Sequence, residues 1–213
     1  MKLLLIDTCG AEGSVALAEG SQVLAAEVLP GRSASERLVP VIRLALEGQG
    51  LRLGELAAIV VVHGPGSFTG VRVGLSAAKG LSEAAGVPLV AVSRLAVLAR
   101  GAGRVLAVLD AGRGEFYFGE YVDGRCVGES LVTQAELVEA VGGAEVVVCE
   151  ARVVAALEGV VRVRVVAEPV AGDVVGIGME RVEAGSFDDA AVVDANYLRR
   201  TDEQLFARPK VAV

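Results

Sequence analysis

The chain contains the same pattern twice, and this internal repeat constrains the fold more than any other feature of the sequence. Residues 2–23 (KLLLIDTCGAEGSVALAEGSQV) and residues 104–127 (RVLAVLDAGRGEFYFGEYVDGRCV) each begin with an apolar strand that ends in an aspartate, Asp7 or Asp110. A turn containing glycine and a strand of alternating residues follow in both copies. The aspartate lies twelve residues before the glutamate that closes the second strand in the first copy, and ten residues before it in the second. With a slip of two residues in the turn, the copies align, and they predict two similar α/β units.

The elements after each hairpin follow a common order. In the first half we expect a third strand, a helix behind Ser33-Ala-Ser-Glu36, the strand AAIVVV, a helix from about Thr69 to Ala85 and the strand VPLVAVS. Because proline fits poorly inside a helix, Pro40 moves the expected start of the first helix toward Val39. In the second half we expect a helix from Thr133 to Val141, the strand EVVVCE, a helix near residues 152–157, the strand VRVRVV and a final helix over about residues 172–184. Two β-β-β-α-β-α units, with mixed sheets flanked by helices, predict a duplicated actin-like (ASKHA, RNase-H-like) α/β fold. We place one actin-like subdomain at residues 1–100 and the other at residues 101–213.

The segment HGPGSFTGVRVGLSAAKGL, residues 63–81, has three glycines within residues 64–70. The phosphate-binding pattern GxxxxGK[ST] fails, because Thr69 and Val71 stand where its second glycine would have to be. The dinucleotide pattern GxGxxG also fails, because the last glycine comes one residue late, at position 70. Two interpretations stay open: Ser67 or Thr69 caps the following helix, or the loop contacts a nucleotide or phosphate. Candidates for the second are Asp7, Gly64, Gly66, Ser67 and Asp110.

The helix that follows this loop is rich in small residues, namely Gly70, Gly74, Ala77, Ala78 and Gly80. Glycine inside a helix costs roughly 1 kcal/mol relative to alanine, a cost that is tolerated where another backbone must come close. One apolar stripe of the helix faces the chain's own sheet, and a second apolar strip lies elsewhere on the helix. A helix that is apolar on two sides is either fully buried or packed against a partner, and we favour a partner helix.

Few residues of the chain are suited to catalysis. His63 is the only histidine, which excludes multi-histidine metal sites, and we expect it to be a hydrogen-bonded structural residue. The three cysteines are far apart and form no CxxC pair, which predicts a reducing, cytoplasmic setting and no disulfide framework or zinc site. The sequence contains no run of eighteen uninterrupted apolar residues, so we expect no transmembrane helix. A rival interpretation is a stand-alone actin-fold ATPase or kinase that uses Asp7, Asp110 and the loop at residues 64–70.

The net charge of −7 argues against a stand-alone nucleic-acid binder, because affinity for phosphates comes largely from Lys and Arg. Candidates for a transient tRNA contact are in the last stretch of the chain: Arg199, Arg200, Arg208 and Lys210.

Four collinear stretches resemble one known family across nearly the whole chain. They are IDTCGAEGSVAL (residues 6–17), HGPGSFTGVRVGLSAAKGL (63–81), LDAGRGEFYFGEY (109–121) and ANYLRR (195–200). The segment GPGSFTG-x-R-x-G is the most specific of these, and by it the chain resembles the TsaB (YeaZ) family of tRNA threonylcarbamoyladenosine biosynthesis. Two positions depart from the family pattern: Ala34 stands where many members have histidine, and Arg113 is displaced by one residue.

The resemblance implies a non-catalytic subunit that binds and activates the paralogue TsaD, which carries the metal and the transferase chemistry. It implies no metal and no cofactor bound by this chain alone, with any ATP or ADP at the interface of the complex. It also implies a TsaE-like ATPase as a further partner, a homodimer when TsaD is absent, and tRNA contact only through the complex. The implied partner-facing residues are Leu38, Val41, Ile42, Ala45, Gly70, Val73, Gly74, Ala77, Ala78, Gly80 and Leu81.

Overall fold

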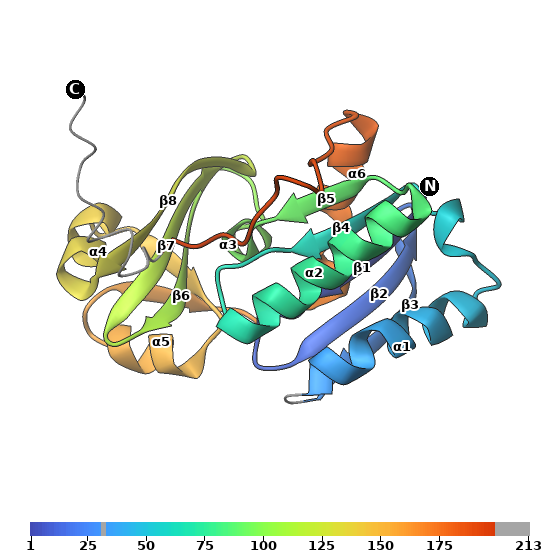
Figure 1. Ribbon diagram of the computed structural model, residues 1–213. Coiled ribbons are helices and arrows are strands. Elements are labelled where there is room, and N and C mark those ends of the chain that lie inside the picture. Colours follow the sequence, from blue (N-terminus) through green and yellow to red (C-terminus); the bar gives the residue numbers. More distant parts are fainter. Residues whose placement is uncertain (31–32, 199–213) are drawn as a thin grey trace, which may run out of the picture.

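The computed structural model describes residues 1–30 and 33–198, which form two mixed five-stranded sheets (Figure 1). The first sheet has the strand order β3-β2-β1-β4-β5, and the second has the same order counted from its other edge, β10-β9-β6-β7-β8. In each sheet the first strand of the unit pairs antiparallel with the second and parallel with the fourth. The order confirms the predicted duplication, and the fifth strand of each unit, β5 or β10, forms in the predicted segment VPLVAVS or VRVRVV.

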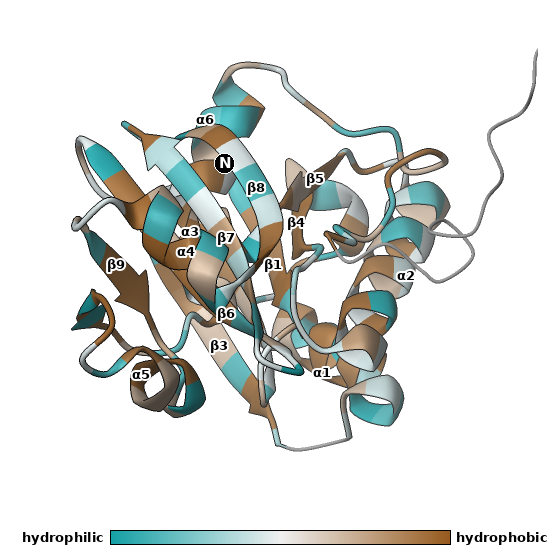
Figure 2. Ribbon diagram, turned by 90° about the vertical axis from the view of Figure 1, so that its left-hand side faces the viewer, coloured by the Kyte–Doolittle hydropathy of each residue, from teal (hydrophilic) through white to brown (hydrophobic). Residues whose placement is uncertain are grey.

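The central strands are apolar along almost their whole length because both faces of each sheet are covered. Every side chain of β4 is buried, for example, and in Figure 2 β9 is drawn brown along most of its length. The strands of the first sheet are β1 Lys2–Asp7, β2 Gly13–Glu19, β3 Gln22–Leu29, β4 Ala58–Val62 and β5 Leu89–Val92. Those of the second are β6 Arg104–Gly112, β7 Glu115–Val122, β8 Arg125–Thr133, β9 Glu145–Val148 and β10 Arg162–Val165.

Two long helices, α1 (Ala34–Gly48) and α2 (Phe68–Ala85), lie side by side on one face of the first sheet (Figure 1). The prediction that α1 starts near Val39 is wrong, because the helix begins at Ala34 and contains Pro40. Leu38 precedes Pro40 and is buried in the core beneath α1. Burial of that side chain stabilises the first turns of the helix and offsets the backbone hydrogen bond that proline cannot make.

The other face of the first sheet is covered by the end of the chain. The 3-10 helix η3 (Ala171–Val174) and helix α6 (Val175–Glu183) pack there against the same core as β1 and β4. The backbone N–H of Asn196 then donates to the carbonyl of His63. By packing, residues 171–195 therefore lie on the N-terminal unit, although the sequence places them in the range 101–213, whereas Leu198 packs against a core cluster of the second unit.

The second sheet carries the shorter helices α4 (Gln134–Val141) and α5 (Ala151–Leu157) on one face. Thr133 and Glu136 form the predicted capping box of α4. Helix α3 (Arg94–Leu98) packs on the opposite face and joins the two units, and the sequence did not predict it because five residues carry too little periodicity. A single 3-10 turn, η2 (Leu53–Glu55), precedes β4. Within the described ranges, no helix has the length and apolar character needed to cross a membrane.

Candidate functional site

The glycine loop and the start of α2 lie tightly against the end of β1. Ser67 is the N-cap of α2, and its hydroxyl accepts a hydrogen bond from Gly70 N at 3.3 Å. A Cβ added to Gly70 would lie 1.9 Å from the carbonyl oxygen of Thr8, and one added to Gly66 would lie 2.4 Å from that of Cys9. A Cβ at Gly74 would lie 2.3 Å from Thr8 Oγ1. Gly66 and Gly70 therefore admit the chain's own backbone, and Gly74 admits the Thr8 side chain.

The two flanks of α2 are also partly covered within the chain. Val73, Ala77 and Leu81 are half-buried and pack against the same core cluster as Ala45 of α1. On the other flank Lys79 Nζ donates to the carbonyl of Val193, and Arg72 Nε donates to the Tyr197 hydroxyl at 2.7 Å. The open part of α2 is therefore a narrow outer strip that contains Ser76, Gly80, Glu83 and Ala84.

The structure divides the residues expected at a partner interface into three groups. Leu38, Val41, Ile42, Gly74 and Ala78 are buried, because they form the stripes that face the chain's own sheet. Ala45, Gly70, Val73, Ala77 and Leu81 are half-buried, and Gly80 is exposed. The buried residues therefore hold α1 and α2 on the sheet and have no surface that a partner could contact.

Two exposed apolar side chains of α1 were missed by the sequence analysis. Val39 is 51% exposed and Leu44 is 59% exposed. The signal was present in the sequence, because both residues are apolar and lie outside the buried stripe of the helix. We call the outer surface formed by Leu44, Ser76, Gly80 and Ala84 the α1–α2 face.

A cleft of about 640 Å³ lies between the two units. It is lined by Gly66, Ser67 and Asp110, which were among the candidates for a phosphate contact. Asp7 is buried, and its Oδ1 accepts a hydrogen bond from Cys9 N at 2.8 Å, just as Asp110 Oδ1 accepts one from Gly112 N at 2.8 Å. The duplicated strand ends therefore form equivalent turns, while only the second aspartate reaches the cleft.

Gly64, the remaining candidate, is buried and its carbonyl accepts from Arg94 N at 2.7 Å. His63 is half-buried, with Nδ1 3.0 Å from the carbonyl oxygen of Asp194, which confirms its structural role. Burial raises the pKa of the Cys149 thiol to about 11 and that of Cys9 well above its ordinary value. Neither thiol is therefore ionised near neutral pH.

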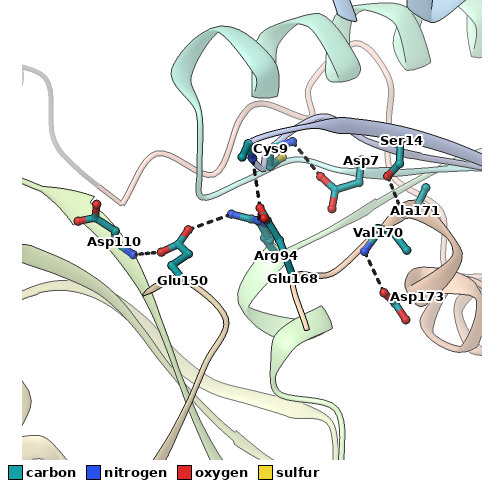
Figure 3. Close-up of polar contacts among 11 residues, drawn as sticks. Asp7, Cys9, Ser14, Arg94, Asp110, Glu150, Glu168, Val170, Ala171 and Asp173 are labelled. Carbon is teal, nitrogen blue, oxygen red and sulfur yellow. Dashed lines mark hydrogen bonds and ion pairs between the residues drawn. The ribbon is translucent and has the colours of Figure 1, made fainter. Parts of the chain in front are cut away.

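Arg94 lies at the base of the cleft and connects the two units (Figure 3). The residue is only 1% exposed, and its guanidinium pairs with Glu168 at 2.6 Å and with Glu150 at 3.4 Å. Burial opposes its charge, but the carboxylate of Asp7 leads the groups that raise the Arg94 pKa. Burial in turn raises the pKa of Asp7 and of Glu150, against the opposing effect of Arg94. No local sequence pattern indicates this network, because its residues come from segments far apart in the chain.

A second set of contacts joins the units on the other side of α3. The carboxylate of Glu129 accepts hydrogen bonds from Ser93 at 2.5 Å, from Asn196 at 2.6 Å and from the Tyr121 hydroxyl. Burial raises the pKa of Tyr121, so its hydroxyl stays a donor. Ser93 and Arg94, which are neighbours in sequence, thus bind the second unit in two separate places.

Among residues 1–30 and 33–198, no group of three or more His, Cys, Asp or Glu side chains is arranged to hold a metal ion. Arg199, Arg200, Arg208 and Lys210, the candidates for a tRNA contact, lie outside the described residues.

Comparison with known proteins agrees with the resemblance found in the sequence. Residues 28–156, more than half of the chain, match the family model described as TsaD: tRNA N6-adenosine threonylcarbamoyltransferase. The tRNA threonylcarbamoyladenosine biosynthesis protein TsaB of Escherichia coli (strain K12) is 40% identical over 127 residues, which are 57% of this chain and 55% of that protein. The alignment thus spans about half the length of this curated relative.

Two solved structures extend the comparison. The structure titled "YeaZ from Pseudomonas aeruginosa" is 30% identical, with a TM-score of 0.78 over 92% of this chain and 99% of that one. The ethanolamine utilization protein EutJ from Carboxydothermus hydrogenoformans, at 13% identity and a TM-score of 0.53, is similar in fold alone. These structures confirm the duplicated actin-like fold, and together with the sequence matches they show that the chain belongs to the TsaB (YeaZ) family.

Proposed function

We propose that this chain is a non-catalytic subunit in the synthesis of threonylcarbamoyladenosine in tRNA, where it binds and activates a TsaD-like transferase. The observation that carries this proposal is the match to relatives named TsaB. The family model that matches residues 28–156 is described as the transferase itself, which supports a paralogue as the partner. The matched range includes α1 and α2.

We place the partner on the α1–α2 face. Leu44 exposes more than half of its surface there, and a side chain at Gly80 would meet no atom within 4 Å. Small residues on the outer strip of α2 let a second helix approach closely, since the distance between packed helices depends on the side chains at the contact. The same face would pair with a second copy of the chain when the transferase is absent, in an isologous dimer.

The other components of the proposal come from the resemblance to the TsaB family. A TsaE-like ATPase joins the complex as a third protein, ATP or ADP binds where the subunits meet, and tRNA reaches this chain only through the complex. The chain works in the cytoplasm with these partners.

The test uses one substitution on the face and one matched control away from it. Leu44→Arg introduces a charge on the α1–α2 face, and Val127→Arg introduces the same charge at a 63% exposed valine of β8 in the second unit. Light scattering after size-exclusion chromatography measures the complex with the TsaD-like protein. We expect Leu44→Arg to weaken the complex at least tenfold, while Val127→Arg binds as the wild type does.

The measurement also separates this proposal from the rival one. Equal binding by both variants would move the partner away from the α1–α2 face. No complex at all, together with ATP hydrolysis by the isolated chain, would overturn the subunit role and favour a stand-alone ATPase or kinase.

A further inference from the structure

Glu168 places its carboxylate in a position that resembles that of a bound ligand. Its Oε1 accepts a hydrogen bond from Arg94 Nη2 at 2.6 Å and another from the backbone N–H of Ala11 at 3.1 Å (Figure 3). A Cβ at Gly10 would lie 2.4 Å from this oxygen, so the turn after β1 leaves room for the carboxylate in this position because residue 10 is glycine. A backbone N–H and an arginine thus converge on one carboxylate oxygen that lies in the cleft.

The arginine of this pair is fixed in place before any ligand arrives. Arg94 is 1% exposed and held by Glu150, and its Nε has no hydrogen-bond partner among the described residues. A charge-assisted bond to such a buried guanidinium is stronger than one between neutral groups. The guanidinium of Arg94 therefore remains in position whether or not Glu168 occupies it.

Glu168 itself is the least embedded member of the network. Its side chain is 40% exposed, against 25% for Glu150 and 2% for Arg94. It lies between β10 and η3, in a segment without regular secondary structure, and it lines the open cleft of about 640 Å³. Rotation of this side chain into solvent would expose both donors to the cleft.

The charges around Arg94 select the kind of ligand. Asp7 and Glu150 also face the guanidinium, so the network already has more negative than positive groups. Exchanging the Glu168 carboxylate for another carboxylate leaves the local charge unchanged, whereas a phosphate dianion adds one more negative charge in a partly buried site. A singly charged carboxylate is therefore favoured over phosphate.

We propose that Ala11 N–H and the Arg94 guanidinium form a carboxylate-binding site, which Glu168 fills from within the chain and which binds the carboxylate of another molecule when Glu168 is removed or turned out. The external carboxylate belongs either to a free acid or to an acidic side chain of another protein. Both present a carboxylate oxygen to the same two donors.

The experiment removes the internal carboxylate and supplies an external one. Glu168→Ala is titrated with sodium acetate, with the N-acetyl amide of glutamate, with phosphate and with chloride at matched ionic strength, while the amide signal of Ala11 is followed by NMR. We expect saturable shifts of that signal with both carboxylates and at least tenfold weaker effects of phosphate and chloride. Tighter binding of the glutamate amide than of acetate would assign the site to an acidic side chain, and the reverse to a free acid.

Two further variants act as controls. Glu168→Gln keeps an oxygen against both donors, so we expect it to bind acetate at least tenfold more weakly than Glu168→Ala. Glu145→Ala removes the carboxylate of an exposed arginine pair, with Arg164, and should show no response at Ala11. If Glu168→Ala does not fold, Glu168→Ser replaces it. An Ala11 signal that acetate leaves unmoved, or that phosphate moves as strongly, would overturn the proposal.

Discussion

Replacing Gly70 with alanine is expected to destabilise the chain by about 3 kcal/mol, although alanine is the better helix former. The new Cβ would lie 1.9 Å from the carbonyl oxygen of Thr8, where ordinary contacts begin at 3.4 Å. The obstacle is backbone rather than a side chain that can rotate away. The start of α2 and the end of β1 must therefore separate.

The magnitude follows from three contributions. Overpacking of this kind costs about 1–3 kcal/mol, and a backbone obstacle places it near the upper end. The separation also breaks the hydrogen bond from Thr8 Oγ1 to Gly70 O, 2.6 Å long in the native chain, a loss of about 1 kcal/mol. The replacement of glycine by alanine returns about 1 kcal/mol through helix propensity, so the net loss stays near 3 kcal/mol.

The matched control is Gly80→Ala in the same helix. No atom lies within 4 Å of a Cβ at Gly80, so only the propensity contributes, and we expect a gain of up to about 1 kcal/mol. Urea unfolding of both variants measures the free energies. If Gly70→Ala retains the stability of the wild type but loses the TsaD-like partner, the glycine serves the partner and not the chain's own β1, and the packing argument is wrong.

Three other perturbations test the network between the units and one helix cap. Arg94→Met leaves the buried carboxylates without their counter-ion, so we expect the free energy of unfolding, measured with urea at pH 7, to fall by about 3–5 kcal/mol. The loss should be smaller at pH 5, where Asp7 and Glu150 take up protons more readily. Equal losses at both pH values would contradict this account. Burial raises the pKa of Glu150, so the folded state binds this proton more tightly than the unfolded state does. The stability that Glu150 contributes is therefore complete below its unfolded pKa and is lost as the pH rises through its folded pKa. The wild type should therefore lose more stability between pH 4.5 and 7 than Glu150→Gln does, in unfolding experiments at about these two pH values, and parallel curves would refute the assignment. Thr133→Ala removes the capping box of α4 and should cost about 1 kcal/mol, whereas no measurable change would mean that the helix end is held by packing alone.

The internal repeat predicted the fold well because its signal is local. The strand-end aspartates, the alternating hairpin strands and the cap at Thr133 each lie within a few residues of the structure that they determine. The start of α1 was predicted wrongly because Pro40 is a local signal that the burial of Leu38 overrides. The packing of η3 and α6 on the first sheet depends on contacts across the chain, such as that of Ala171 N with Ser14 Oγ.

The candidate sites show the same limit. The apolar stripe of α1 was found correctly, but apolar periodicity identifies residues that face a core, and Leu38 and Ile42 face the core of this chain. Glycine content revealed that some backbone approaches α2 closely, and only the structure identifies it as that of Thr8 and Cys9. Arg94 was not predicted, because a charged residue in a short apolar segment carries no sign of the carboxylates that surround it.

The duplicated units differ in one respect that bears on where a partner binds. Helices α1 and α2 have 15 and 18 residues, whereas their counterparts α4 and α5 have 8 and 7. At 1.5 Å per residue the first pair is roughly 22 and 27 Å long and the second roughly 12 and 10 Å. A stable interface buries about 800 Å² on each partner and uses roughly 20–30 residues, an area that a pair of short helices does not offer. The inner sides of α1 and α2 cover the first sheet from Leu38 to Leu46 and from Val71 to Ser82, and their outer sides give a partner a longer surface than α4 and α5 do, which is the reason to look for the partner there.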